Sequence, residues 1–199
     1  MNDFNRDLFL QINGMAGGSE LLDGLVRLFA NDYFVPTSLS ILLLSVWFAG
    51  SDADQRHRHQ RAVLAAPLAV LLVNLAVSYS NSAGITGTRP FMDYARAVET
   101  ARALFYLPPD PSFPSNSAAV AFVLGGLLFW ANRRVGLLGL GLASGIGFAR
   151  VYAGVHYPLD VVAGAVLGLV GAMAAIGIMR IFDPVPSFLL RVGRRLFLA

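Results

Sequence analysis

The chain has 199 residues, of which 56% are hydrophobic and 14% charged, and its mean hydropathy is +0.61. It contains no cysteine, which excludes disulfides, thiolate metal sites and a cysteine nucleophile. Its 15 basic residues are all arginine, and they lie between apolar runs rather than along one polar face. Basic loops beside membrane spans explain this pattern better than nucleic-acid binding does. The composition therefore predicts a single all-α, polytopic membrane domain over residues 1–199.

Residues 1–31 differ from the rest of the chain. Apolar side chains recur there at helical spacing, opposite polar positions: Leu21, Leu22, Leu25, Leu28 and Phe29. This pattern predicts an amphipathic helix at the membrane interface, or one short and distorted span. No cleavable signal peptide is expected, because "MNDFNRDLFLQ" carries two acids and lacks a basic segment before an apolar one.

Five apolar runs follow, at roughly 34–49, 62–79, 117–132, 135–151 and 158–179. Several are shorter than the roughly 20 residues that a perpendicular span needs. Tilt, or helical extension into the flanking residues, would supply the remaining length. Together with the N-terminal segment, the runs predict a bundle of five or six transmembrane helices.

The arginines predict an orientation in the membrane. If the five runs alternate in direction, the arginine clusters in 51–61, 133–134 and 191–195 fall on one side, which the positive-inside rule makes cytoplasmic. The loop 80–116 and the segment around His156 then lie on the extracytoplasmic side of the cytoplasmic membrane. Arginines in the loop 80–116 go against the rule, and an anion site there would account for at least one of them.

Three polar elements fall at the predicted outer ends of spans: "TRPF" (88–91), "PSFPSNSAA" (111–119) and "RVYAGVHYPLD" (150–160). Arg89 and Arg150 carry planar donor forks that suit phosphate oxygens. Ser115, Asn116 and Ser117 directly precede an apolar helix, where they cap it and leave backbone N–H groups facing an anion. These elements predict a phosphate site at one face of the bundle.

His156 and Asp160 supply the chemistry in the third element. His156 is the one histidine expected on the outer side, and Asp160 follows it by four residues. In a helical turn, the carboxylate accepts a hydrogen bond from one ring nitrogen and leaves the other free to attack. Each residue alone also fits a simpler role, such as a cap, an interfacial anchor or an ion pair. Their combination favours a metal-free enzyme that forms a phosphohistidine.

Arg150-x5-His156-x3-Asp160, preceded by Pro114-Ser115 and Arg89-Pro90, resembles the type 2 phosphatidic acid phosphatase family of integral-membrane lipid phosphatases. Within that family the phrases "RPF", "FPSN" and "RVYAGVHYPLDV" are most similar to bacterial undecaprenyl-diphosphate phosphatases of the bacitracin-resistance type. The resemblance implies a nucleophile at His156 oriented by Asp160. It also implies phosphate binding by Arg89, Arg150 and Ser115, with no metal or other cofactor.

The chain departs from the family pattern at three positions. Ser82 stands where a lysine is usual, and Ala149 replaces a serine. Ser117 occupies the position of the histidine that protonates the leaving oxygen, a contribution typically worth about 10²–10⁴-fold in rate. Either another group such as Asp110 or Tyr94 acts as the acid, or the change serves to trap substrate, or the chain is a pseudoenzyme.

Ser117 bears on the substrate because leaving groups differ in their need for a proton. A monophosphate ester expels an alkoxide, whereas a diphosphate expels a lipid monophosphate that is already a stabilised anion. The leading hypothesis is therefore hydrolysis of a polyprenyl diphosphate, such as undecaprenyl diphosphate, to the monophosphate carrier used in envelope synthesis. The alternatives are a phosphatase for phosphatidate or phosphatidylglycerol phosphate, and a protein that binds lipid phosphates without turnover. Residues 92–113 are expected to form a lid or a surface amphipathic helix.

Overall fold

The computed structural model describes residues 3–195, and this part of the chain is helical with no strand, which confirms the predicted all-α class. The helices are α1 (Asp3–Asn13), α2 (Glu20–Ala30), α3 (Phe34–Trp47), α4 (Ala53–Ser82), α5 (Pro90–Asp93), α6 (Ala95–Leu104), α7 (Asn116–Ala131), α8 (Arg133–Tyr152), α9 (Pro158–Ile181) and α10 (Pro184–Arg195).

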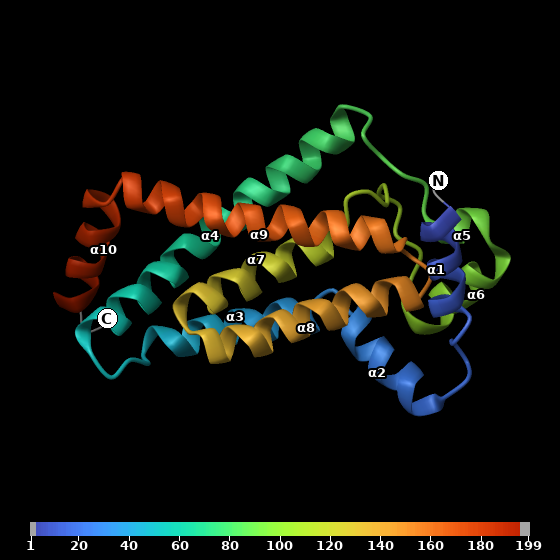
Figure 1. Cartoon of the computed structure of the whole chain (residues 1–199), viewed down its shortest axis with the longest axis horizontal. Helices are drawn as coiled ribbons and strands as arrows, with labels where there is room; N and C mark the ends of the chain where they lie inside the picture. Colours follow the sequence, from blue (N-terminus) through green and yellow to red (C-terminus); the bar gives the residue numbers. More distant parts are fainter. Residues whose placement is uncertain (1–2, 196–199) are drawn as a thin grey trace.

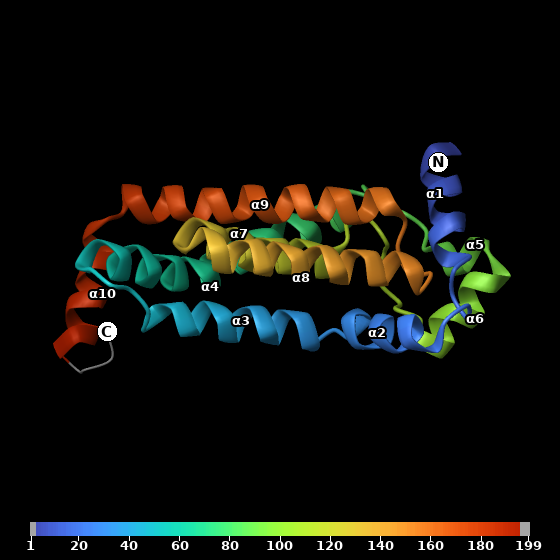
Figure 2. The same cartoon turned by 60° about the horizontal axis from the view of Figure 1, so that its bottom comes forward.

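The body of the bundle is formed by long helices that run lengthwise, namely α3, α4, α7, α8 and α9 (Figures 1 and 2). Helix α7 lies at its centre and packs against α3, α4, α8 and α9. The short helices α1, α5 and α6 gather at one end, and α10 lies at the other (Figure 1). The main apolar core forms where α3, α4, α7, α8 and α9 meet, so the fold is organised around α7.

Three helices are long and apolar enough to cross a membrane: α4, α8 and α9. The pair α2 and α3, bent by 63° at the break between them, passes the same test when taken together and would make a fourth. Helix α7 is apolar but has only 16 residues. These findings support a multi-pass membrane protein, and the count of five or six spans stays a prediction.

Helix α4 is longer than the apolar run that predicted it. It begins at Ala53 because the Asp52 side chain accepts a hydrogen bond from the Gln55 backbone N–H at 2.8 Å, which caps the helix. The polar segment 53–61 therefore extends the apolar span by more than two turns. Between α4 and α7, residues 95–104 form the helix α6, which packs against α2 where Leu104 shares an apolar cluster with Val26 and Ala30.

Small residues bring α9 very close to α7. A Cβ atom added to Gly168 would lie 2.3 Å from the carbonyl oxygen of Ala119, and one added to Gly164 would lie 2.4 Å from that of Ser115. Glycine lets two helix backbones approach to this distance, as is common inside membranes. This contact holds the first turn of α9 beside the start of α7, where the predicted site residues lie.

Candidate active site

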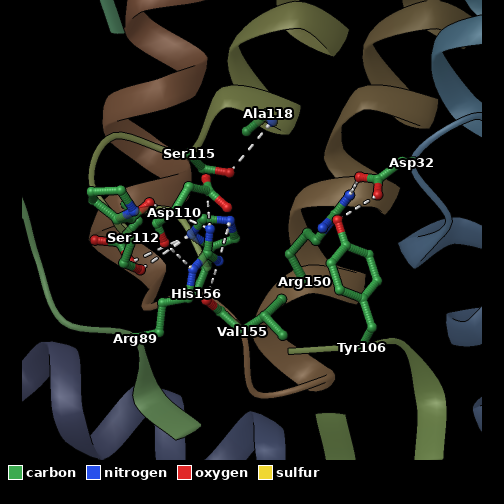
Figure 3. Close-up of polar contacts among 12 residues, drawn as sticks. Asp32, Arg89, Tyr106, Asp110, Ser112, Ser115, Ala118, Arg150, Val155 and His156 are labelled. Carbon is green, nitrogen blue, oxygen red and sulfur yellow. Dashed lines mark hydrogen bonds and ion pairs between the residues drawn. The ribbon is translucent and has the colours of Figure 1, made fainter. Parts of the chain in front are cut away.

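The three predicted polar elements meet at the end of the bundle that holds α5 and α6 (Figure 3). Arg89 precedes α5, Ser112 and Ser115 precede α7, and His156 and Asp160 lie at the junction of α8 and α9. All five side chains are buried. Residues up to 71 positions apart are thus placed in one cluster, because the helices that carry them end at the same level.

A tight turn between α8 and α9 presents His156. Gly154 has a φ of 81°, and its backbone lies so close to α6 that an added Cβ would be 2.9 Å from the carbonyl oxygen of Ala97. Both the left-handed conformation and the lack of space require glycine there. Helix α9 then begins at Pro158, and the Asp160 carboxylate accepts a hydrogen bond from the Tyr157 backbone N–H at 2.8 Å. The turn fixes His156 between the ends of two long helices.

The two ring nitrogens of His156 face different groups. Nδ1 lies 3.3 Å from the hydroxyl of Ser112 and 3.7 Å from the Asp160 carboxylate, and the Ser112 hydroxyl donates to that carboxylate. Ser112 therefore bridges His156 and Asp160, a role that the sequence motif does not indicate. Asp160 is within ion-pair distance of the ring, but its link to Nδ1 passes through the serine.

The surroundings of His156 select one tautomer. Nε2 lies 3.3 Å from an Nη of Arg89, and because arginine can only donate, Nε2 accepts. The proton then sits on Nδ1, toward Ser112. Burial lowers the pKa of His156, the Asp160 carboxylate opposes this shift, and the Arg89 charge adds to it. The ring is therefore neutral near pH 7, with the lone pair on Nε2 directed toward Arg89.

Arg89 is held by acceptors on both sides of the cluster. Its guanidinium donates to the Asp110 carbonyl at 2.7 Å, to the Asp110 carboxylate at 2.9 Å and to the Val155 carbonyl at 2.9 Å. Burial lowers the pKa of Arg89, and the Asp110 charge acts in the opposite direction. These bonds tie the loop before α7 to the turn that carries His156. They also place a cation beside Nε2 of His156.

Arg150 points away from His156 (Figure 3). Its guanidinium forms an ion pair with Asp32, stacks on the Phe105 ring at 4.2 Å from the centroid, and leaves its Nε without a hydrogen-bond partner. Tyr106 donates to the same Asp32 carboxylate at 2.9 Å, and burial raises the pKa of that phenol. Arg150 is therefore held by Asp32, and Asp32 is held in turn by Tyr106. The sequence analysis did not predict either of these two residues.

The polar residues at the start of α7, positions 115–117, differ in burial. Ser115 is buried, caps α7 by accepting from Ala118 N–H at 3.5 Å, and donates its own N–H to the Asp160 carbonyl at 3.0 Å. Asn116 is exposed and Ser117 half-buried in the first turn, and neither side chain bonds to another residue in the described range. Ser117 is thus the second residue of α7, two positions after the cap Ser115, and its side chain is partly accessible.

The two suggested substitutes for the missing acid lie in different places. The Asp110 carboxylate bonds to Arg89 and is 60% exposed, so it borders the cluster from the solvent side. Tyr94 packs its ring against Phe9 of α1, with the centroids 5.6 Å apart. Asp110 is the one that contacts a site residue.

Within residues 3–195, no group of three or more histidines and carboxylates is placed to hold a metal ion.

Comparisons of the sequence and of the fold relate this chain to known proteins. The sequence model described as the PAP2 superfamily matches residues 56–183. Undecaprenyl-diphosphatase BcrC of Bacillus subtilis (strain 168) is 27% identical over 168 residues, 83% of this chain and 79% of that protein. Bacitracin transport permease protein BcrC of Bacillus licheniformis is 47% identical over 64 residues, which cover 32% of each chain. The crystal structure of Aquifex aeolicus LpxE superposes with a TM-score of 0.63 and 26% identity, covering 87% of this chain and 95% of that one.

Proposed function

The chain belongs to the PAP2 superfamily, and on that premise we propose that it is a membrane phosphatase that hydrolyses a polyprenyl diphosphate to the monophosphate and inorganic phosphate. Undecaprenyl diphosphate is the first substrate to test, because a relative that matches most of the chain is named for it. The observation that carries the proposal is the buried, neutral His156, whose Nε2 faces Arg89 and whose Nδ1 is backed by Ser112 and Asp160.

In the first step, Nε2 of His156 attacks the terminal phosphorus of the diphosphate. The N–P bond forms as the bond between that phosphorus and the bridging oxygen breaks, and the lipid monophosphate leaves with the bond's electrons. The ring keeps its proton on Nδ1 and becomes cationic. Ser112 and Asp160 stabilise this charge, because the carboxylate draws the serine hydroxyl and leaves its oxygen to accept from Nδ1–H.

In the second step, water attacks the phosphohistidine. The new O–P bond forms as the N–P bond breaks, both water protons stay on the released phosphate, and His156 returns to its neutral form. Arg89 and the free N–H groups at the start of α7 hold the charge of the transferring group in both steps. Arg150 joins them when its guanidinium exchanges Asp32 for a phosphate oxygen.

The substrate class follows from Ser117. A serine hydroxyl is a poor acid near neutral pH, and Asp110, the nearby carboxylate, is paired with Arg89. A diphosphate tolerates this lack, since its leaving group is already a stabilised anion. The chain should therefore favour diphosphates over monophosphate esters such as phosphatidate. Ser117→His should reduce the ratio of the diphosphate rate to the phosphatidate rate.

The decisive experiment measures phosphate release from undecaprenyl diphosphate and from phosphatidate, with EDTA present. We expect the parent to prefer the diphosphate, His156→Ala to be at background, and His57→Ala, a control at the far end of the bundle, to keep the parent's rate. Ser117→His should raise the phosphatidate rate more than the diphosphate rate. Full activity in His156→Ala would overturn the mechanism. Binding without release by the parent and by Ser117→His would favour the non-catalytic alternative.

We also propose that the site faces the extracytoplasmic side of the cytoplasmic membrane. The arginine clusters that the positive-inside rule assigns to the cytoplasm lie at the opposite end of the bundle from His156. The chain has no cysteine, so one introduced at exposed Thr86 is a unique label site. A membrane-impermeant maleimide should react with it in intact cells. If the introduced cysteine reacted only after the membrane was opened, the site would face the cytoplasm, and the proposed orientation would be wrong.

A further inference from the structure

Two adjoining cavities lie at the end of the bundle away from His156. One of about 210 Å³ opens between the start of α4 and the ends of α7 and α9, and one of about 590 Å³ opens between α4, α7 and the start of α8. Arg58 and Trp130 line both. In Figure 1 these helix ends lie toward α10, at the opposite end of the molecule from α5 and α6. Nothing in the proposed phosphatase mechanism uses them.

Unpaired positive charge gathers around these cavities. Four arginines that line them form no ion pair with a carboxylate in the described part of the chain: Arg58, Arg133, Arg134 and Arg180. Arg61 differs, since it pairs with Asp183. Asp54 contributes one negative charge to the smaller cavity. The net charge of the lining is therefore strongly positive, which favours an anion.

Two of these arginines are anchored in ways that leave most of their donors free. Arg58 donates through Nε to the Ala131 carbonyl at 3.3 Å, which satisfies the end of α7 and leaves both terminal nitrogens available. The Arg180 guanidinium lies over the Trp130 ring, 5.9 Å from its centroid. A guanidinium presents a planar fork that matches two oxygens of a phosphate group. Arg58 and Arg180 line the same cavity, so both can donate to one phosphate group there.

The opposite wall of the smaller cavity is apolar, formed by Trp130, Ile176 and Met179. The two tryptophans of the chain, Trp47 and Trp130, lie in the last turns of α3 and α7, at the same end. Tryptophan concentrates where lipid headgroups meet the hydrocarbon region. The cavity therefore has arginines on one side and apolar side chains on the other. A phospholipid likewise has a phosphate next to its acyl chains.

We propose that an anionic phospholipid of the leaflet opposite His156 binds in the smaller cavity. Its phosphate lies between Arg58 and Arg180, and the first part of its acyl chain runs along Trp130 and Met179. Basic pockets between helices at the cytoplasmic level recognise such headgroups. A free phosphate would bind the arginines but would make no contact with the apolar wall, so a phospholipid is the better fit. The site shares no residue with the phosphatase site.

Trp130 itself reports on the site. In a Trp47→Phe background it is the single tryptophan, and brominated lipids quench its fluorescence on contact. We expect brominated phosphatidylglycerol to reach half-maximal quenching at a mole fraction at least fivefold lower than brominated phosphatidylcholine. Arg180→Gln should remove most of that difference. Arg102→Gln, which removes an exposed arginine of α6 at the other end, should leave it unchanged.

Equal quenching by the two lipids, or an unchanged preference in Arg180→Gln, would overturn the proposal. Reversal of the quenching by millimolar inorganic phosphate would assign the site to a soluble anion instead, and would overturn it as well. Native mass spectrometry of the parent keeps the test independent of the Trp47→Phe background. It should show retained phosphatidylglycerol that is lost in Arg180→Gln but kept in Arg102→Gln.

Discussion

Replacing Gly164 with alanine tests whether the contact between α9 and the start of α7 sets the geometry of the site. The added Cβ would lie 2.4 Å from the Ser115 carbonyl oxygen and 3.2 Å from the Ala118 Cβ, whereas ordinary contact begins at 3.4 Å. Neither neighbour is the end of a flexible side chain. The two helices must therefore part by about 1 Å at this level.

That displacement acts directly on the site. Ser115 caps α7 and donates its backbone N–H to the Asp160 carbonyl at 3.0 Å, so parting the helices moves the turn that we propose binds phosphate away from His156. A misplacement of about 1 Å can lower a rate by about 10²-fold, and overpacking costs about 1–3 kcal/mol of stability. We expect Gly164→Ala to lower kcat/KM by about 100-fold and to lower the unfolding midpoint moderately.

Phosphate release and thermal unfolding in the same detergent separate the two effects. Gly177→Ala is the matched control, because it lies in the same helix with nothing within 4 Å of the added Cβ, and it should leave both quantities unchanged. Gly168→Ala meets the Ala119 carbonyl oxygen at 2.3 Å, one turn farther from the site. It should lower stability as much as Gly164→Ala but lower the rate less. Parent-like kcat/KM in Gly164→Ala would refute the reasoning.

Three further predictions concern the polar groups. Ser112→Ala removes the bridge to Asp160 and should lower kcat by about 10–100-fold, as loss of a hydrogen bond to a charged group of about 1.5–3 kcal/mol implies; a parent-like single-turnover rate would contradict it. Asp32→Asn removes the charge that competes for Arg150, a pair worth about 1 kcal/mol or less at a partly exposed carboxylate, so inhibition by inorganic phosphate should strengthen up to about fivefold. Because burial lowers the pKa of His156, the neutral ring persists below its ordinary 6.5, and the acid limb of kcat/KM against pH should lie below that value; a limb at 6.5 or above would contradict this, because burial would then not set the protonation of the ring.

The fold class and the meeting of the three motifs were predictable because they depend on local patterns. The runs at 135–151 and 158–179 match α8 and α9 within two residues at each end, and apolar runs of similar length bring their ends to the same level. The start of α4 was not predicted, since Ala53 follows from the cap at Asp52 rather than from hydropathy. Hydropathy thus locates the apolar part of a helix better than its ends.

The missed residues share a physical reason. Asp32 reaches Arg150 across 118 positions of sequence, and no periodicity links an acid at the end of one helix to an arginine in another. Ser112 lies in the same stretch as the predicted Ser115, but the orientation of its hydroxyl depends on how α9 packs beside the loop. Only tertiary packing decides such pairs. The one available signal was Asp32 itself, an acid placed between two apolar segments.

The length of α7 has a consequence for the bilayer around the protein. Its 16 residues cover about 24 Å, less than the roughly 30 Å of a typical hydrocarbon core, and the helix is enclosed by four longer or equally apolar neighbours. If α7 spans the hydrocarbon core as proposed, a reaction centre at its first turn would be recessed below the headgroup plane unless the membrane thinned locally. A lipid diphosphate must then be drawn inward to reach His156, and a thick bilayer opposes that movement. Turnover would therefore respond to membrane thickness, which would link lipid recycling to the composition of the membrane itself.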